Sequence, residues 1–243
     1  MNCRVVIALD FPTAEEAEAL LSRLEAEEKP FVKVGMQLFY AAGPRWVERL
    51  KERGCDVFLD LKLHDIPNTV AGAVDSVARL GVDLLTLHAC GGRAMMEAAR
   101  EARDRSGASS LRLVAVTQLT SLDQRVLNEE LGIPGTVEAC VSRYARMARE
   151  SGMDGAVCSG WEVEGIKAMG GPDFLAVVPG IRPKGEAAQD QKRVMTPQEA
   201  AARGADLLVV GRPITRAADP AAAYRAIVRA VQNAGRDRCG LEC

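Results

Sequence analysis

Short apolar runs recur along the whole chain, and each is followed by an amphipathic stretch long enough to form a helix. Runs rich in valine, leucine and isoleucine predict buried strands, and the stretches between them have the spacing of helices with one buried face. Strands that alternate with helices are typical of parallel sheets with crossover helices. We predict eight strands, at residues 5–9, 31–34, 57–61, 84–87, 111–116, 155–158, 174–178 and 207–210.

Three helix starts can be recognised from their residues. Thr13 is followed three residues later by Glu16, and Thr196 by Glu199, which is the pattern of a capping box. Pro67 suits the first position of a helix, because the N–H that proline lacks would be unpaired there in any case. The crossovers between the predicted strands are therefore expected to be helical.

Eight strand–helix units within 243 residues favour an α/β fold of the closed (β/α)8 TIM-barrel type over an open sheet. No linker or low-complexity tract interrupts the pattern, so residues 1–243 are expected to form a single domain. A short helix is expected at residues 124–131, and residues 235–243 are expected to form a frayed tail. Barrel enzymes carry their chemistry at the carboxyl ends of the strands, so the polar residues there are the candidates.

The charge balance argues against a nucleic-acid or membrane partner. The chain has 31 Lys and Arg residues and 33 Asp and Glu residues, which gives a formal net charge of -2. It therefore has no general positive field that would attract a polyanion. No apolar run approaches the roughly 20 residues that a membrane-spanning helix needs. An anionic ligand must accordingly be held by local groups.

The cysteines and histidines give no sign of a metal site. The seven cysteines are scattered and show neither a CxxC pair nor the spacing of structural zinc. His88 lies near Cys90, but one histidine and one cysteine are too few ligands for zinc. His64 is expected to be a hydrogen-bonded supporting residue. The chain enters its first strand without the apolar stretch of a signal peptide, so we expect reduced thiols, no metal and a cytoplasmic protein.

Two opposite charges are separated by one residue at the end of the third predicted strand. Asp60 and Lys62 lie two residues apart, so on a strand their side chains point to the same face. Charges at the mouth of a barrel need partners, and Lys33 and Asp10 from the two preceding strands can extend the pair into a network. Two interpretations remain open, namely a catalytic group or a structural ion pair that closes the barrel.

Arginines follow the last two predicted strands. Arg182 comes shortly after the seventh strand, and Arg212 follows Gly211 at the end of the eighth. Phosphate sites in these barrels commonly form from the loops after strands seven and eight, with backbone N–H groups and a bidentate arginine. For the Gly211–Arg212 pair taken alone, a turn with a solvated arginine is the stronger interpretation, and its position after the eighth strand favours phosphate binding.

The segment 60–69, Asp-Leu-Lys-Leu-His-Asp-Ile-Pro-Asn-Thr, resembles the Asp-x-Lys-x-x-Asp-Ile-Pro-x-Thr signature of bacterial orotidine 5'-monophosphate decarboxylases. The similarity covers nearly the whole chain, with no departure at a motif position. Further matching segments are 7–10, 32–35, 87–89, 116–121, 179–182, 190–193 and 210–214. The resemblance implies a cofactor-free barrel enzyme that converts orotidine 5'-monophosphate to uridine 5'-monophosphate and CO2 in de novo pyrimidine biosynthesis.

The resemblance also implies a role for each matching residue. Lys62 would stabilise the carbanion at C6 and protonate it, with Asp60 beside the departing carboxylate. Asp65, of the same catalytic set, and Thr69 would reach into the partner's site of a homodimer. The other substrate contacts would come from Asp10 and Lys33 at the ribose, Thr120 at the pyrimidine, Gln191 between pyrimidine and phosphate, and Arg182, Gly211 and Arg212 at the phosphate.

Residues 180–193 are expected to form a lid that binds the phosphate. The segment contains Gly180, Gly185 and a run of charged residues, a composition that suits a mobile loop. Binding energy from the phosphate can be used to close such a loop over the substrate and exclude water.

Two alternative functions stay open at this point. A magnesium-dependent sugar-phosphate decarboxylase or hexulose-phosphate synthase of the same superfamily shares the Asp-x-Lys-x-x-Asp pattern, but it lacks the Ile-Pro-x-Thr continuation and the Asp-Gln-x-Arg lid. A non-catalytic barrel that binds uridine 5'-monophosphate would be supported by a missing network residue, and none is missing. Sensitivity to a chelator tests the first alternative, and turnover tests the second.

Overall fold

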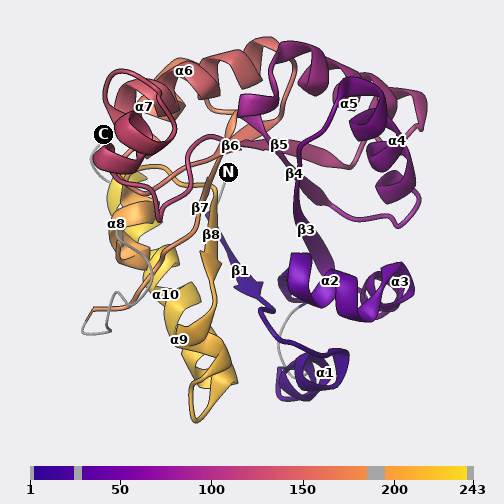
Figure 1. Cartoon of the computed structure of the whole chain (residues 1–243). Coiled ribbons are helices and arrows are strands. Elements are labelled where there is room, and N and C mark those ends of the chain that lie inside the picture. Colours follow the sequence, from indigo (N-terminus) through magenta and orange to yellow (C-terminus); the bar gives the residue numbers. More distant parts are fainter. Residues whose placement is uncertain (1–2, 25–28, 185–194, 240–243) are drawn as a thin grey trace.

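A computed structural model describes residues 3–24, 29–184 and 195–239. Within these residues, parallel strands β1 to β8 pair in sequence order, and β8 pairs with β1 to close the barrel (Figure 1). The predicted fold class is confirmed, and each predicted strand is present. The strands are β1 Arg4–Ala8, β2 Phe31–Gly35, β3 Asp56–Leu63, β4 Leu84–His88, β5 Arg112–Val116, β6 Gly155–Val157, β7 Leu175–Val178 and β8 Leu207–Val210.

Helices surround the barrel and connect successive strands (Figure 1). They begin where the sequence predicts, since Thr13 and Thr196 are N-cap residues and Pro67 is the first residue of α4. At Thr196 both hydrogen bonds of a capping box are present. The helices are α1 Ala14–Ser22, α2 Met36–Ala42, α3 Pro44–Glu52, α4 Pro67–Ala78, α5 Arg93–Arg105, α6 Val137–Glu150, α7 Val163–Gly170, α8 Pro197–Ala202, α9 Arg212–Thr215 and α10 Pro220–Cys239, with the short turns η1 Ala89–Gly91 and η2 Val126–Glu130.

Two segments differ in detail from the expected elements. The short helix expected at residues 124–131 contains a π-helical turn, η2, in which the Leu131 N–H bonds the Val126 carbonyl. The backbone of α10 is helical as far as Cys239, which takes in the first part of the expected tail 235–243, while residues 240–243 lie outside the described part. Among the described helices, none is both long and apolar enough to cross a membrane.

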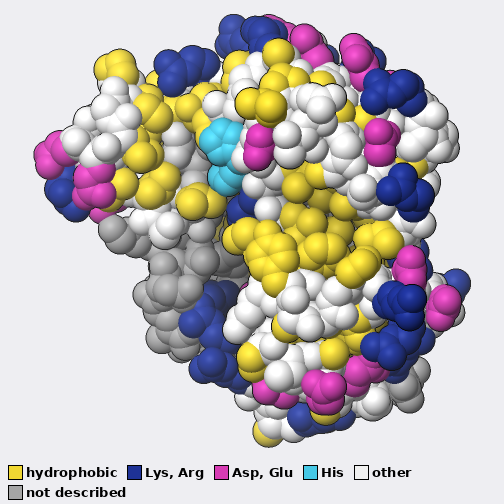
Figure 2. Space-filling view, turned by 45° about the vertical axis from the view of Figure 1, so that its right-hand side comes forward, with side chains coloured by type: hydrophobic (Ala, Val, Ile, Leu, Met, Phe, Trp, Pro, Cys, Tyr) yellow, Lys and Arg dark blue, Asp and Glu magenta, His cyan; other side chains and the backbone are white. Residues whose placement is uncertain are grey.

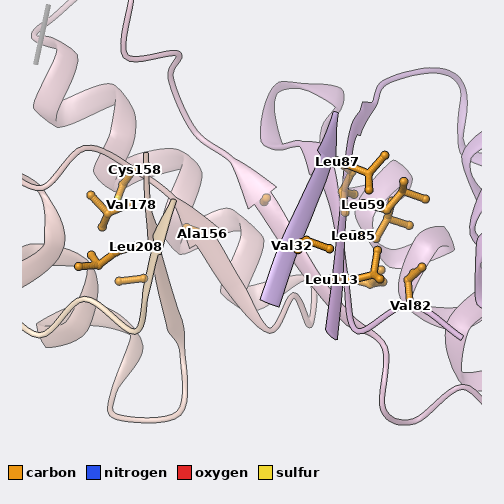
Figure 3. Close-up of a cluster of buried hydrophobic side chains, with 14 of the residues drawn as sticks. Val32, Leu59, Val82, Leu85, Leu87, Leu113, Ala156, Cys158, Val178 and Leu208 are labelled. Carbon is orange, nitrogen blue, oxygen red and sulfur yellow. The ribbon is translucent and has the colours of Figure 1, made fainter. Parts of the chain in front are cut away.

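The core has two layers because successive residues of a strand point to opposite faces. Inside the barrel, Val6, Phe58, Leu84 and Val114 belong to one cluster of buried apolar side chains. Outside it, a larger cluster fills the space between strands and helices. Figure 3 shows part of this outer layer, with Leu59, Leu85 and Leu113 on the neighbouring strands β3, β4 and β5. Burial of each large side chain contributes about 1.5–3 kcal/mol, so the packed barrel gives a rigid frame for the loops at its carboxyl end.

Candidate active site

A cavity of about 770 Å³ opens at the carboxyl ends of the strands. Its volume is within the usual range for a small-molecule site. Residues from seven of the eight strands, all except β4, and from their following loops line it, so the closed barrel brings together side chains that are far apart in sequence. The predicted site residues in its lining are Asp10, Lys33, Asp60, Lys62, Thr120, Arg182, Gly211 and Arg212.

Four charged side chains form an alternating chain across the first three strands. The Lys33 Nζ atom on β2 donates to Asp10 Oδ1 at 2.9 Å and lies 3.5 Å from Asp60 Oδ2 on β3. The Lys62 Nζ atom donates to the same Asp60 oxygen at 2.8 Å. Each charge therefore has an opposite neighbour, as a half-buried charged group requires.

The two central members of this chain are held in their charged forms. Burial by itself raises the pKa of the Asp60 carboxyl, but Lys33 and Lys62 outweigh burial and bring the pKa below its ordinary value. Burial likewise disfavours the charge on Lys33, yet Asp10 and Asp60 together raise the pKa of this amine. The site consequently presents a fixed carboxylate between two ammonium groups.

The backbone at Lys62 is strained. Its φ angle of 52° lies in the left-handed region, and no other non-glycine residue in the described part has a positive φ. A residue with a side chain pays about 1–2 kcal/mol for this conformation. The strain coincides with an irregularity in β3, since Leu59 pairs with Leu85 but Leu63 pairs with Leu87. Two extra residues of β3 therefore bulge out at the point where the charged pair stands.

Thr86 on β4 is the residue opposite this bulge, and sequence reasoning missed it. Its side chain is fully buried, and its hydroxyl donates to Asp60 Oδ1 at 2.9 Å while accepting the backbone N–H of Lys62 at 2.9 Å. The available signal was that Thr86 is the polar residue within the apolar run 84–87. Gln118, which lines the cavity and bonds the Cys140 sulfur, was also missed.

The same cavity contains the two arginines predicted to bind phosphate. Arg182 is buried, and its guanidinium donates to the Ile181 carbonyl at 2.8 Å. Arg212 is the first residue of α9, directly after β8 and Gly211. Gln191 lies outside the described residues, as do residues 185–193 of the predicted lid.

Asp65 and Thr69 do not join the site of their own chain. Both side chains are exposed, and neither residue lines the cavity. The Asp65 carboxylate accepts the N–H of Ile66 at 2.7 Å, just before α4 begins. The segment that matches the signature most closely is thus divided, with Asp60 and Lys62 facing the cavity and the two later residues facing outward.

The two histidines lie next to each other at the rim of the barrel. The ring centroids of His64 and His88 are 5.5 Å apart. Burial, followed by the proximity of His64 and Lys62, lowers the pKa of His88. In the described part of the chain, His, Cys, Asp and Glu side chains form no group of three that could hold a metal ion.

Comparison with known proteins identifies the family. The family model described as "Orotidine 5'-phosphate decarboxylase / HUMPS family" matches residues 3–227. The chain belongs to this family. A family member named orotidine 5'-phosphate decarboxylase from Cutibacterium acnes (strain DSM 16379 / KPA171202) is 54% identical over 96% of this chain and 98% of its own length. Another with the same name, from Geobacillus thermodenitrificans (strain NG80-2), is 54% identical over 92% of this chain and 95% of its own length.

A solved structure of the same family supports the fold. The crystal structure of orotidine 5'-phosphate decarboxylase from Lactobacillus acidophilus is 41% identical to the chain and superposes with a TM-score of 0.85. The match covers 95% of this chain and 99% of that one. The resemblance inferred from the signature segment is therefore confirmed at the level of family and fold.

Proposed function

We propose that the chain catalyses the decarboxylation of orotidine 5'-monophosphate to uridine 5'-monophosphate and CO2, without a metal or organic cofactor, as a step of pyrimidine biosynthesis. The observation that carries the proposal is the Lys62 ammonium group, 2.8 Å from the Asp60 carboxylate inside the cavity. The names of the relatives agree with this activity. The Ile-Pro-x-Thr continuation at residues 66–69 favours it over the sugar-phosphate activities of the wider superfamily.

The reaction requires a cation at the carbon that loses CO2. When the C6–carboxylate bond breaks, the electron pair stays on C6 as a vinyl carbanion that the ring does not delocalise. The charge on Lys62 stabilises this pair, and Nζ then gives C6 a proton and recovers one from solvent. Asp60 stands beside the departing carboxylate, where its repulsion of the substrate is relieved as CO2 leaves. Lys33 keeps Asp60 ionised and, with Asp10, contacts the ribose.

The rest of the substrate is held by neutral and basic groups in the same cavity. Thr120 contacts the pyrimidine, and Arg182, Arg212 and the Gly211 N–H bind the phosphate. Gln191 bridges the pyrimidine and the phosphate from the lid at residues 180–193. Because the phosphate is remote from C6, its binding energy is available to close the lid and to exclude water from the charged network.

We further infer that the chain acts as a homodimer in which Asp65 and Thr69 complete the partner's site. Two observations support this. Both residues are exposed and turned away from their own cavity. Large apolar side chains are also exposed, with Ile66, next to Asp65 in sequence, at 66% and Tyr40, on α2, at 74%. Figure 2 shows apolar side chains gathered on the face that carries the two histidines. Such a surface is typical of a protein–protein interface.

Mixed dimers test the shared site. Subunits with Lys62→Ala should regain activity when they are mixed with Asp65→Ala subunits, because each heterodimer then has one intact site. We expect up to about one quarter of wild-type activity per subunit from random mixing, with half of the dimers heterodimeric and one of their two sites intact. Native mass spectrometry counts the heterodimers. Inactive mixtures with confirmed heterodimers would refute the shared site.

A cytoplasmic location is part of the proposal. The described cysteines Cys3, Cys55, Cys90, Cys140 and Cys158 are all free thiols. Unpaired cysteines fit a reducing compartment, where pyrimidine biosynthesis would also meet its precursors. Fractionation of cells that produce a tagged chain tests this, and recovery outside the cytoplasmic fraction would contradict it.

The activity itself is tested by following the absorbance of orotidine 5'-monophosphate in excess chelator. We expect rapid loss of absorbance with the wild-type chain and none with Lys62→Ala. Decay that occurs only in a parallel assay without chelator would indicate a metal-dependent reaction. Tight binding of uridine 5'-monophosphate without any decay would favour the non-catalytic alternative.

A further inference from the structure

One hydroxyl group connects the two charged residues of the site. Thr86 Oγ1 donates its hydrogen to Asp60 Oδ1 and accepts the backbone N–H of Lys62, each at 2.9 Å. A hydroxyl has one donor and two acceptor positions, so both bonds form at the same time. Thr86 does not line the cavity and is fully buried. It therefore acts on Asp60 and Lys62 and has no contact with a ligand of the cavity.

The bulge in β3 explains why a side chain is needed at this point. Backbone N–H and C=O groups of a regular strand face its two neighbours alternately, and the Asp56 N–H of β3 faces the β2 side, where it bonds the Pro30 carbonyl. A regular continuation of β3 would turn the Lys62 N–H to that same side. The register change between Leu59 and Leu63 instead brings this N–H to β4, where the Thr86 hydroxyl accepts it at 2.9 Å. Thr86 supplies an acceptor from its side chain in place of the backbone. Its β-branched side chain is stiff at χ1, so the hydroxyl is fixed in direction.

The hydrogen bond from the Thr86 hydroxyl fixes the orientation of the Asp60 carboxylate. Oδ1 is occupied by the Thr86 hydroxyl, and Oδ2 is left for Lys62 Nζ at 2.8 Å and Lys33 Nζ at 3.5 Å. Rotation of the carboxylate would break the bond to Thr86 and change both distances to the lysines. The same hydroxyl thus controls the strained backbone of Lys62 and the plane of the carboxylate to which its ammonium group is bonded.

We propose that Thr86 is a positioning residue for decarboxylation, whose hydroxyl holds Lys62 in its left-handed conformation and aligns Asp60 with it. The inference rests on the proposed function, in which Lys62 is the proton donor. A hydroxyl that only stabilised the fold would change the amount of folded enzyme. A positioning hydroxyl changes the rate of each folded molecule, because small displacements of reacting groups cost up to about 100-fold in rate.

Two matched pairs of variants isolate the hydroxyl. Thr86→Val keeps the shape of wild type and removes the hydroxyl. Thr86→Ala and Thr86→Ser both remove the methyl group, and only the serine keeps the hydroxyl. We expect kcat per binding site to fall roughly 10- to 100-fold in the valine and alanine variants. The serine variant should stay within about threefold of wild type. KM should change by less than about threefold throughout, since no substrate contact is lost.

A control variant separates this effect from the loss of any buried hydroxyl. Thr117 is also buried near a strand end, but its hydroxyl donates to the Val157 carbonyl at 2.8 Å and touches none of the charged residues. Thr117→Val should keep the wild-type kcat per binding site. Titration with uridine 5'-monophosphate gives the concentration of binding sites, and thermal unfolding reports the folded fraction.

The outcomes distinguish this inference from the proposed function. A wild-type kcat in folded Thr86→Val, beside an inactive Lys62→Ala, would overturn the positioning role alone. If Thr86→Val does not fold, equal kcat values for the serine and alanine variants would overturn it, and at least tenfold faster turnover by serine would support it. Turnover above one hundredth of wild type in Lys62→Ala would refute the proton-donor assignment whatever Thr86 does.

Discussion

At the amino-terminal end of the barrel, aspartates each join two neighbouring strands and a helix, whereas at the carboxyl-terminal end four charged side chains form one continuous chain. In the described part of the amino-terminal end, the same arrangement occurs three times. In each case an aspartate directly precedes strand β4, β6 or β8. It accepts a backbone N–H from near the start of the previous strand, β3, β5 or β7. It also bonds a basic side chain on the helix that leads into that previous strand. The sets are Asp83 with Val57 and Lys51, Asp154 with Leu113 and Arg103, and Asp206 with Ala176 and Lys167.

The carboxyl-terminal end follows a different rule. Lys33 lies between two carboxylates, and Asp60 lies between two lysines, so the four charges form one continuous chain. The groups come from three strands, and Lys62 adopts a strained backbone conformation. The first arrangement joins neighbouring elements and stabilises the fold. The second holds charges close together where a substrate can reach them, at a cost in strain.

The largest expected effect comes from Lys62→Ala. Removal of the proposed acid and cation should lower kcat by at least about 10⁴-fold. Asp60 keeps its contacts with Lys33 and Thr86, so the free energy of unfolding should change by only about 1 kcal/mol. Single-turnover kinetics and urea unfolding measure the two quantities. A large loss of stability would contradict the inference that the charges that stabilise the fold lie chiefly at the amino-terminal end. Residual turnover above one hundredth of wild type would contradict the role of Lys62.

The amino-terminal aspartates should show the opposite behaviour. Asp206→Ala leaves Lys167 and the Ala176 N–H without their buried partner, and we expect a loss of about 3 kcal/mol in the free energy of unfolding. The kcat of the folded fraction should not change. The three aspartates differ in burial, since the side chains of Asp206, Asp154 and Asp83 are 9%, 17% and 34% exposed. The loss of stability should decrease in that order, and equal losses would show that burial does not set the effect.

The elements that rest on local residue patterns were predictable from the sequence. The strands and the caps at Thr13 and Thr196 depend on residues next to each other, and all of them are present. The contact between Asp60 and Lys62 was also predicted, because side chains two apart on a strand share a face. The alternation was sufficient here, even though the backbone between them is irregular.

The features that depend on pairing between strands were not predictable. The left-handed Lys62 and the role of Thr86 arise from the register between β3 and β4, and the residues that form the bond are 24 positions apart. The expected helix at residues 124–131 contains a π-helical turn, since helix spacing does not distinguish the hydrogen-bonding pattern inside so short a segment. The roles proposed for Asp65 and Thr69 depend on a second subunit, and they were inferred from the resemblance to the family and from no pattern within this chain alone.

A smaller effect is expected at the carboxyl-terminal residues that we propose to bind the phosphate. Arg212→Ala removes charge-assisted hydrogen bonds worth about 1.5–3 kcal/mol, so KM should rise roughly 10- to 100-fold while kcat changes less. Uridine should bind the variant and wild type equally, because it has no phosphate. Isothermal titration with uridine 5'-monophosphate and uridine compares them. Arg203→Ala, whose arginine stacks on Trp161, serves as a control that should change neither affinity. Equal weakening of both ligands would refute the phosphate role.

The smallest effect is a dependence of stability on pH that belongs to the carboxyl-terminal network. Lys33 and Lys62 outweigh burial and lower the pKa of Asp60 in the folded chain. As the pH falls, the unfolded chain therefore protonates Asp60 at a higher pH than the folded chain does. The stabilisation from the ionised carboxylate is fully present above the ordinary pKa of about 3.9. It is lost as pH falls below that value and through the folded pKa.

Asp60→Asn cannot titrate, and it resembles the protonated wild type. We expect wild type to be the more stable at pH 7, and the difference in free energy of unfolding to shrink between about pH 4 and pH 3. Urea unfolding at four pH values measures this difference, and a constant value would show that the lysines do not stabilise the charge on Asp60.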